Sequence, residues 1–339
     1  NYFYYFDNFM SYYTENEYPI DAVITWVDGT DPKFLKKKQK FSKGKNISQA
    51  NTASRYNQVG EIDFVIKSIL KNVPFVRKIF IVTDDQIPKV LIDSQKWLPK
   101  YQNKLQLVDH KEIFSDYINY LPSFNILSIE SLFHKIKGLS EHFIYFNDDM
   151  FVVRPTKIED WFLKGKPIIR GRWVNMPDKV WYKVFKNWIF SNKNKFSFKK
   201  SQALSAKIVG FKKKYFRTYH NPRALKKSYY KNFYDDNKGL LANQVKPRFR
   251  LATQYNPYAL AWHYAIKNQL AITTKEMKLI EINFSINDNP NKVLKGLKKV
   301  EKKSEILFLN LQSLDLVPKA KLKIIMNVLN NLIKIDLTK

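Results

Sequence analysis

The sequence contains no cysteine in its 339 residues. Disulfides and thiolate metal sites are therefore excluded, and this composition is typical of a reducing cytosol. The sequence also lacks any run of about 18 apolar residues, the length that a membrane-spanning helix needs. The N-terminal stretch is aromatic but has neither a basic start nor a small-residue cleavage site, so we expect no signal peptide. Together these absences predict a cytoplasmic protein.

Negative charge is scarce, with 30 acidic residues against 59 Lys and Arg and a net charge of +29. Such an excess attracts nucleic acid, an anionic membrane face or an acidic polymer, although a solvated lysine-rich surface has the same composition. No recognition helix, zinc-finger spacing or RNP-like motif is present. We therefore expect no nucleic-acid partner. Peripheral contact with the anionic inner face of the plasma membrane remains an open expectation.

Apolar residues are plentiful enough for a sizeable core, at 45% of the chain with 15% aromatic. Strand-like apolar runs alternate with helix-like stretches along the first half. The predicted strands cover 21–27, 77–85, 104–110 and 141–149, and the predicted helices cover 60–72 and 128–139. A further amphipathic helix is predicted at 319–335. This alternation predicts an α/β fold with a mostly parallel sheet flanked by helices.

Acidic residues follow three of the predicted strands. They are Asp28, then Asp84 and Asp85, then Asp148 and Asp149. Since ligands of open α/β sheets bind beyond the carboxyl ends of the strands, we expect one shared acidic crevice. Neighbouring carboxylates repel each other, and Asp148 and Asp149 are candidate ligands for Mg²⁺ or Mn²⁺ carried with a phosphate substrate. The alternative is that they cap a helix or pair with lysines.

The composition changes between about 160 and 235, which is rich in Lys, Trp, Tyr and Phe. We divide the chain into an N-terminal extension at 1–19, an α/β core at 20–159 and 236–339, and a basic, aromatic-rich insertion at 160–235. Because the insertion shows little periodicity, we expect it to be helical or irregular. We expect it to cover the crevice and to supply positive charge.

Four ordered motifs resemble a known family. They are "TWVDGTDP", "IFIVTDDQIP", "PSFNILSIE" and "GLSEHFIYFNDD", and they resemble the first two conserved regions of the Stealth family. The third region is matched by "YHNPRALKKSYYKNFYDDN" followed by "KPRFRLATQYN". The fourth is only partly present: in "EILFLNLQS" Asn310 matches, but Leu311 stands where family members have an aspartate. That departure puts in doubt any role for an acid at this position.

The resemblance implies a GT-A/Rossmann-like enzyme that makes capsular or exopolysaccharide. In this family, a hydroxyl of a glycan acceptor attacks the β-phosphorus of a UDP-sugar, UMP leaves, and hexose-1-phosphate or N-acetylhexosamine-1-phosphate is joined as a phosphodiester. Two alternatives remain. One is a metal-dependent glycosyltransferase that releases UDP. The other is a non-catalytic polyanion-binding module, which the lysine content and Leu311 would favour.

Four residues are candidates for the chemistry. His220 is the first candidate for the base, because an imidazole can accept a proton near neutral pH. Arg250 suits bidentate clamping of the transferred phosphoryl group, although a surface salt bridge is the alternative. Asp28 and Asp149 would hold the cation or contact the donor, and one of the aspartates would be the base if His220 is not.

Further residues are candidates for substrate binding. Trp26 is expected either to stack on uracil or to lie in the core. The amides of Asn125 and Asn147 are expected to bind sugar hydroxyls or phosphate oxygens, and Arg55 a phosphate. The full set of candidates is Trp26, Arg55, Gln86, Asn125, Asn147, Arg248 and Asn310.

Overall fold

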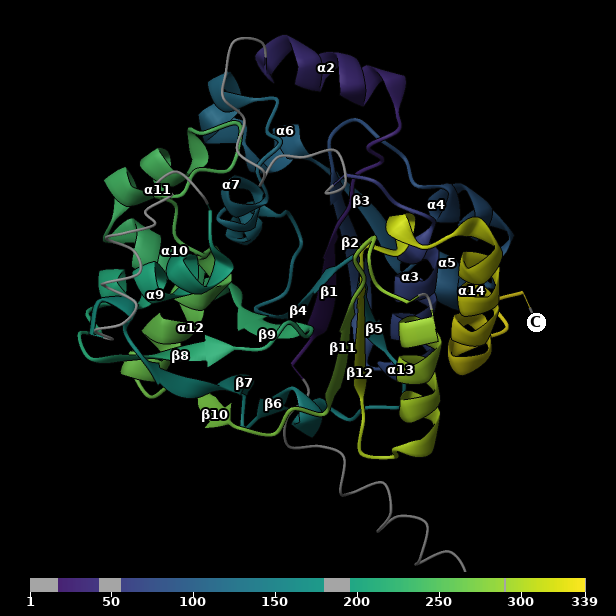
Figure 1. The fold of residues 1–339 in the computed structure, drawn as a ribbon. Coiled ribbons are helices and arrows are strands. Elements are labelled where there is room, and N and C mark those ends of the chain that lie inside the picture. Colours follow the sequence, from purple (N-terminus) through teal and green to yellow (C-terminus); the bar gives the residue numbers. More distant parts are fainter. Residues whose placement is uncertain (1–17, 43–55, 180–195, 290, 339) are drawn as a thin grey trace, which may run out of the picture.

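The computed structural model describes residues 18–42, 56–179, 196–289 and 291–338. Its centre is a five-stranded sheet in the order β3-β2-β1-β4-β9 (Figure 1). The strands are β1 (Ile20–Thr25), β2 (Val76–Thr83), β3 (Leu105–Asp109), β4 (His142–Asn147) and β9 (Arg223–Lys226). β1 pairs in parallel with β2 and β4, β2 pairs in parallel with β3, and β9 is antiparallel to β4. The predicted α/β fold with a mostly parallel sheet is confirmed.

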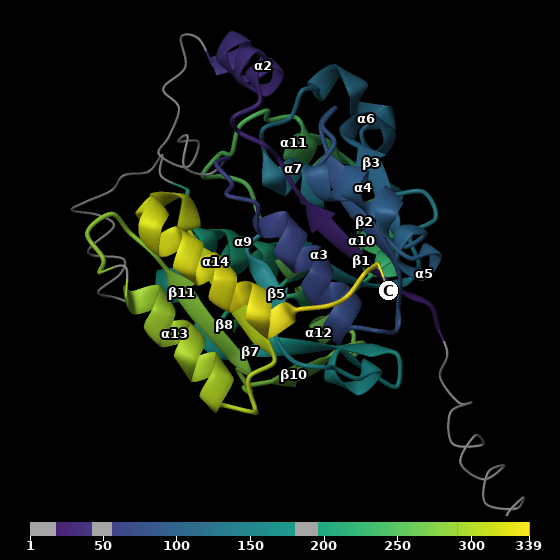
Figure 2. The same cartoon turned by 90° about the vertical axis from the view of Figure 1, so that its right-hand side faces the viewer.

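Helices cover both faces of this sheet, because its strands alternate apolar side chains between two cores. Ile24 and Phe146 face one core, and Val23 and Tyr145 face the other. The first core is closed by α3 (Glu61–Asn72), α13 (Asn291–Lys302) and α14 (Lys319–Ile333), which lie together in Figure 2. The second is closed by α10 (Lys227–Asp235), α11 (Lys238–Val245) and α12 (Pro257–Lys267). The helices predicted at 60–72 and 319–335 are confirmed.

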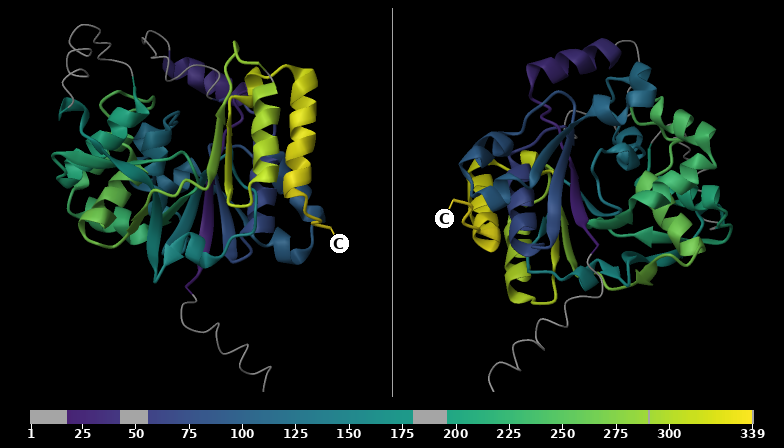
Figure 3. Two further views of the ribbon diagram at one scale, coloured as in Figure 1. Left: turned by 60° about the horizontal axis from the view of Figure 1, so that its bottom comes forward. Right: turned by 180° about the vertical axis from the view of Figure 1, so that it is seen from behind.

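Two smaller sheets extend the centre (Figure 3). One has the order β11-β12-β5, from β11 (Leu279–Asn283), β12 (Phe308–Gln312) and β5 (Met150–Val152). The other joins β10 (Ile272–Thr274), β7 (Lys166–Asn175), β6 (Phe162–Leu163) and β8 (Lys214–Thr218). Since β5 follows β4 after a two-residue turn, the first of these sheets reaches the carboxyl end of the central sheet.

The stretch at 160–235 is more regular than the sequence indicated. Its described residues form β6, β7, β8, β9, α9 (Phe198–Val209) and α10. β9 pairs with β4, so the last part of this stretch belongs to the central sheet. β8 and β9 are short and pair antiparallel with β7 and β4, which lie far away in the sequence, and this hides them from a search for local periodicity.

The helix expected at 128–139 is interrupted. The structure has α7 (Ile126–Glu130) and then a 3₁₀ turn, η6 (Phe133–Lys135). Ser131 Oγ donates to Leu127 O, and Ser128 Oγ donates to carbonyl groups of the chain near 244–247. Such side-chain bonds to the backbone compete with helix continuation.

The remaining elements are short and lie at the edges of the fold. They are α2 (Pro32–Ser42), α4 (Lys89–Asp93), η4 (Ser94–Lys96), α5 (Pro99–Gln102), α6 (His110–Ile113), η5 (Ser115–Tyr120), η7 (Ile158–Asp160), η8 (Pro177–Lys179) and η9 (Leu314–Leu316). Within the described ranges, no helix is long and apolar enough to span a bilayer.

Candidate active site

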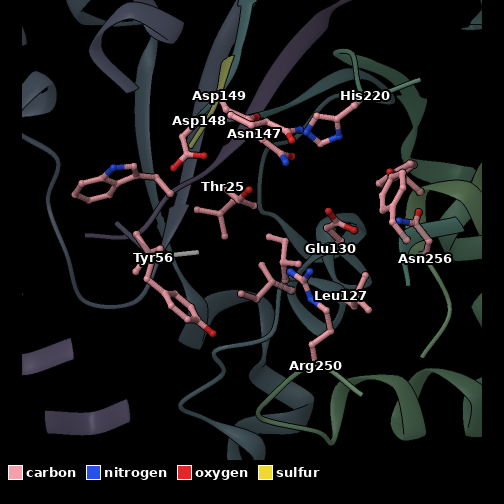
Figure 4. A pocket seen from close by; sticks show the side chains of 18 of the residues that line it. Thr25, Tyr56, Leu127, Glu130, Asn147, Asp148, Asp149, His220, Arg250 and Asn256 are labelled. Atoms are coloured by element: carbon pink, nitrogen blue, oxygen red, sulfur yellow. Dashed lines mark hydrogen bonds and ion pairs between the residues drawn. The ribbon is translucent and has the colours of Figure 1, made fainter. Parts of the chain in front are cut away.

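A cavity of about 850 Å³ opens at the carboxyl ends of β1, β2 and β4. This volume lies in the range of pockets that hold small ligands. Its lining comes from the central sheet, from the β11-β12 sheet and from the stretch after residue 196. Figure 4 shows Asn147, Asp148 and Asp149 with His220 next to them, and the side chains of Glu130 and Arg250 facing the same space.

Carboxylates line one side of the cavity, which we call the acid wall: Glu61, Asp148, Asp149 and Asp315. Asp148 and Asp149 form the turn between β4 and β5. The backbone oxygen of Asp149 accepts from Leu311 N and from Asn310 Nδ2, both at 3.0 Å. The strand β12 therefore holds this turn in place. Leu311 itself packs into the core, with 1% of its surface exposed.

The two adjacent aspartates have opposite pKa shifts. Burial, followed by the nearby carboxylates of Asp149 and Glu61, raises the pKa of Asp148 well above its ordinary value. Burial would also raise the pKa of Asp149, but the neighbouring His220 outweighs it and holds that pKa below its ordinary value. Burial likewise raises the pKa of Glu61, again with a contribution from Asp149. Of these three carboxylates, only Asp149 has surroundings that favour its charged form.

Cationic side chains also line the cavity, and we call them the basic wall: Lys199, Arg217, His220, Arg223 and Arg250. His220 Nε2 lies 3.4 Å from Asp149 Oδ2, so the two walls meet at this contact. The guanidinium of Arg250 lies 4.9 Å from the centre of the Phe196 ring and lines the same cavity. The aspartates after β4 and the later imidazole and guanidinium thus face one space.

A buried polar network lies behind the basic wall. Tyr145 Oη donates to Glu130 Oε1 at 2.9 Å and also bonds Thr25 Oγ1 at 3.1 Å. Burial raises the pKa of Glu130, although the Arg223 guanidinium opposes this. In the described part of the chain, Glu130 Oε2 is buried without a hydrogen-bond partner. The network gives the cavity a carboxylate that a ligand can still engage.

The acid wall fits a divalent cation. Asp149 Oδ1 is buried and has no hydrogen-bond partner among the described residues, and burial with the nearby carboxylates raises the pKa of the neighbouring Asp148, which a bound cation would lower. No cluster of three or more His, Cys, Asp or Glu arranged as metal ligands occurs within those same ranges. Two carboxylates suit Mg²⁺, which keeps several waters and takes its other ligands from substrate phosphates.

Six of the predicted site residues line the cavity together: Trp26, Asn147, Asp148, Asp149, His220 and Arg250. Trp26 also packs into the core, with 8% of its surface exposed. Asn147 Oδ1 accepts from Arg223 Nη1 at 3.1 Å. Asn310 does not line the cavity; its side-chain amide donates to the backbone oxygen of Asp149 and so supports the turn.

The other predicted residues do not line the cavity as the structure describes it. Asp28 Oδ1 accepts from Thr30, and Gln86 bonds the Asp28 backbone, so both shape the loop after β1. Asn125 caps α7 and donates to Gln254. Arg248 donates to two backbone carbonyls and so fastens a loop. Arg55 lies outside the described residues.

Sequence reasoning missed Glu61, Glu130, Arg223 and Asp315. Glu61 and Glu130 sit within predicted helices, where acids usually face solvent, and nothing local marks them as buried. Arg223 directly follows the His-x-Pro motif at 220–222 and opens a strand, and this adjacency could have singled it out. Asp315 follows Leu311 by four residues and is the acid that the region after β12 gives to the cavity.

Comparison with known proteins identifies the early part of the chain. Conserved region 1 of the Stealth proteins matches residues 18–46, and conserved region 2 matches residues 55–169. An exopolysaccharide phosphotransferase of Streptomyces coelicolor is 44% identical over 148 residues, which are 44% of this chain and 24% of that protein. A capsular polysaccharide phosphotransferase of Haemophilus influenzae is 45% identical over 146 residues, 42% of this chain and 38% of that protein. The matched stretch thus spans less than half of these relatives' length.

Solved structures with a similar course of the chain are more distant. The galactosyltransferase LgtC bound to donor and acceptor sugar analogues has a TM-score of 0.42 at 9% identity, covering 93% of this chain and 97% of that one. The glycosyltransferase GlyE of Streptococcus pneumoniae has a TM-score of 0.41 at 10% identity in its apo form, covering 95% and 62%. Likeness at this level carries no functional weight. By these matches, residues 18–169 of the chain carry conserved regions 1 and 2 of the Stealth proteins.

Proposed function

We propose that this chain transfers a sugar-1-phosphate from a UDP-sugar to a hydroxyl group of a glycan, in the synthesis of a capsular polysaccharide or exopolysaccharide. The curated relatives named above are phosphotransferases of such polymers. The cavity is lined by carboxylates and by cationic side chains, and a diphosphate with its cation needs both. The donor, the acceptor and the release of UMP are parts of the proposal.

One observation carries the proposal: His220 of the third region lies 3.4 Å from Asp149 of the second. The two residues are 71 positions apart; Asp149 lies in the turn between β4 and β5, and His220 lies in the loop between β8 and β9. Folding thus brings a titratable imidazole, two carboxylates and the guanidinium of Arg250 around one cavity. A polyanion-binding module without catalysis would not require the imidazole and the carboxylate to meet.

In the proposed reaction, the oxygen of an acceptor hydroxyl forms a bond to the β-phosphorus of the donor, and the bond from that phosphorus to the oxygen of UMP breaks. The hydroxyl proton passes to the pair formed by His220 and Asp149. Arg250 neutralises charge on the equatorial phosphoryl oxygens, for which a guanidinium has the matching fork. A bound Mg²⁺ or Mn²⁺, held by Asp148 and Asp149, would neutralise the diphosphate.

The proposed function also gives a role to the net charge of +29, which would attract an anionic product or membrane. Both a growing phosphodiester polymer and an anionic lipid surface would be attracted to the lysine-rich exterior, at about 1 kcal/mol for each basic residue near such a surface. If this attraction is real, raising the salt concentration weakens the association of the chain with vesicles of anionic lipid or with polymer. Association that is unchanged by salt would remove this part of the proposal.

The test is a panel of UDP-sugars incubated with the purified chain, Mg²⁺ and an oligosaccharide acceptor. Chromatography of the nucleotide products separates the candidates, because sugar-phosphate transfer releases UMP and glycosyl transfer releases UDP. The His220→Ala and Asp149→Ala variants should lose the activity. Release of UDP by the wild type identifies a glycosyltransferase, and binding of donor without turnover identifies a binding module.

A further inference from the structure

Arg223 is the most deeply buried charge beside the cavity, with 1% of its surface exposed. It is the first residue of β9 and pairs directly with Tyr145 of β4. Its guanidinium is stacked between two rings, 4.1 Å from the centre of Tyr258 and 5.0 Å from that of Tyr145. Burial opposes the charge, but the surrounding tyrosines, Glu130 and Asp149 outweigh this and raise the pKa of Arg223. Arg223 is therefore a fixed cation in a fixed orientation.

The fork of Arg223 connects two residues of the candidate site. Nη1 donates to Asn147 Oδ1 at 3.1 Å, and Nη2 lies 3.4 Å from His220 Nδ1. The second distance is long, but hydrogen bonds at catalytic sites often shorten when the substrate binds. A guanidinium only donates hydrogen bonds. His220 Nδ1 can therefore meet Arg223 favourably only as an acceptor, without a proton.

We propose that Arg223 is a positioning residue that fixes the tautomer of His220, so that Nε2 carries the proton and presents it to Asp149 and to the cavity. Asp149 Oδ2, 3.4 Å from Nε2, is an acceptor and matches this tautomer. Both neighbours of the imidazole thus select the same state. The arrangement is the reverse of a Ser-His-Asp triad, in which the carboxylate accepts from Nδ1 and Nε2 is free to take a proton.

This inference rests on the proposed function and changes the role of His220 within it. An imidazole that presents Nε2–H donates a hydrogen bond to a phosphoryl oxygen of the donor. The proton of the acceptor hydroxyl then goes to a carboxylate of the cavity. The bond changes stay as described: the acceptor oxygen gains the phosphorus, and UMP leaves with the oxygen that held it.

A second buried histidine provides a reference of the opposite kind. His263 Nε2 accepts from the backbone N–H of Phe216 at 3.1 Å, and its Nδ1 lies 2.6 Å from the carbonyl oxygen of Ala259. His263 must therefore carry its proton on Nδ1. The two histidines should give opposite patterns in the same spectrum.

The test is a long-range proton–nitrogen NMR correlation on the whole chain labelled with heavy-nitrogen histidine, at pH near 8. The His220→Ala variant assigns the His220 signals by their loss. We expect His220 with a protonated Nε2 and a bare Nδ1, and His263 with the reverse. A His220 that carries its proton on Nδ1 in the wild type overturns the inference, whether or not the chain transfers sugar phosphate.

Variants of Arg223 test whether this residue fixes the tautomer of His220. Arg223→Gln should shift His220 to the other tautomer or to a mixture, and should lower kcat about 100-fold with the donor KM within about threefold. Arg223→Lys keeps a positive charge and a group that can donate a hydrogen bond to His220 Nδ1, and this variant should show the wild-type tautomer. Arg170→Gln is the matched control: Arg170 is also buried, with 4% exposed, and donates to Asp160 O away from the cavity.

Three outcomes separate this inference from the proposed function. An unchanged His220 tautomer in a folded Arg223→Gln variant contradicts the role of Arg223. If the predicted tautomer is found but no sugar phosphate is transferred, the proposed function fails and the role of Arg223 stands. If Arg170→Gln lowers kcat as much as Arg223→Gln does, the loss is a general effect of removing a buried guanidinium. This result would contradict the claim that Arg223 acts on kcat through His220.

Discussion

The acid wall and the basic wall of the cavity are built in different ways. The central pair of the acid wall, Asp148 and Asp149, follows a buried strand of the parallel sheet, where a local apolar run already marks the position. The basic wall takes Arg217 from an antiparallel strand, Arg223 from the strand added to β4, and Arg250 from a loop. Each wall alone holds charges that burial disfavours. The contact between His220 and Asp149 is where each compensates the other.

The largest effect should come from breaking that contact. Asp149→Asn keeps the shape of the side chain but removes its charge and its acceptance of a proton. We expect kcat for UMP release to fall about 1,000-fold, which is about 4 kcal/mol of barrier. The control Asp288→Asn removes a partly exposed carboxylate outside the cavity that pairs with Lys292, and its rate should change less than twofold. Equal losses in both variants would contradict a special role for Asp149.

On the basic wall, we expect a smaller loss from Arg250→Lys. The charge stays, but the planar fork that can bind two phosphoryl oxygens is lost. We expect kcat to fall about 100-fold, or about 2.7 kcal/mol of barrier. The control is Arg77→Lys, at a guanidinium that pairs with Asp21 outside the cavity. If Arg250→Lys keeps full activity, Arg250 is not a bidentate clamp.

The free energy of unfolding should depend on pH through His263, which packs against β8, the strand that carries Arg217 of the basic wall. His263 accepts a bond from Phe216 of β8, and burial lowers its pKa from 6.5 to about 4. Because the folded pKa lies below the unfolded one, this stability is present above pH 6.5 and is lost as the pH falls towards 4. Between pH 7 and pH 5, one such histidine costs about 2 kcal/mol.

Urea unfolding of the wild type and of His263→Gln at the two pH values checks this. The variant should be less stable at pH 7 but should lose about 2 kcal/mol less than the wild type on going to pH 5. His110 and His134, whose pKa values burial also lowers to about 4, keep their share of the pH dependence in both proteins. Parallel losses in both proteins would show that His263 is not buried in its neutral form.

The smallest expected effect is that of Asp148 on the thermal stability, because its surroundings disfavour its charged form. The folded-state pKa of Asp148 is raised, so the stability it provides is lost as the pH rises through that pKa. Asp148→Asn should therefore raise the Tm by about 1.5 °C near pH 8 without divalent ions, as expected for about 1 kcal/mol in a chain of this size. Mg²⁺ should raise the Tm of the wild type and not that of the variant. If Mg²⁺ raises both equally, Asp148 does not hold the cation.

Much of the fold follows from the sequence because its signals are local. The apolar runs of β1, β2 and β4 and the periodicity of α3 and α14 are visible in windows of a few residues. The pairing of β9 with β4 joins residues about 80 positions apart, and no local pattern records it. For the same reason Asp148 and Asp149 could be predicted from the strand before them, and His220 from its motif. Glu130 could not be predicted, because its role depends on burial by distant elements.

The central claim is tested most directly by following the β-phosphorus of the donor. The chain is incubated with a UDP-sugar labelled at that atom, Mg²⁺ and an acceptor glycan, and the products are separated. If the acceptor attacks the β-phosphorus, we expect the label to move into the glycan and the nucleotide to leave as unlabelled UMP. Label that stays on the released nucleotide, as UDP, while the sugar alone joins the glycan would contradict it.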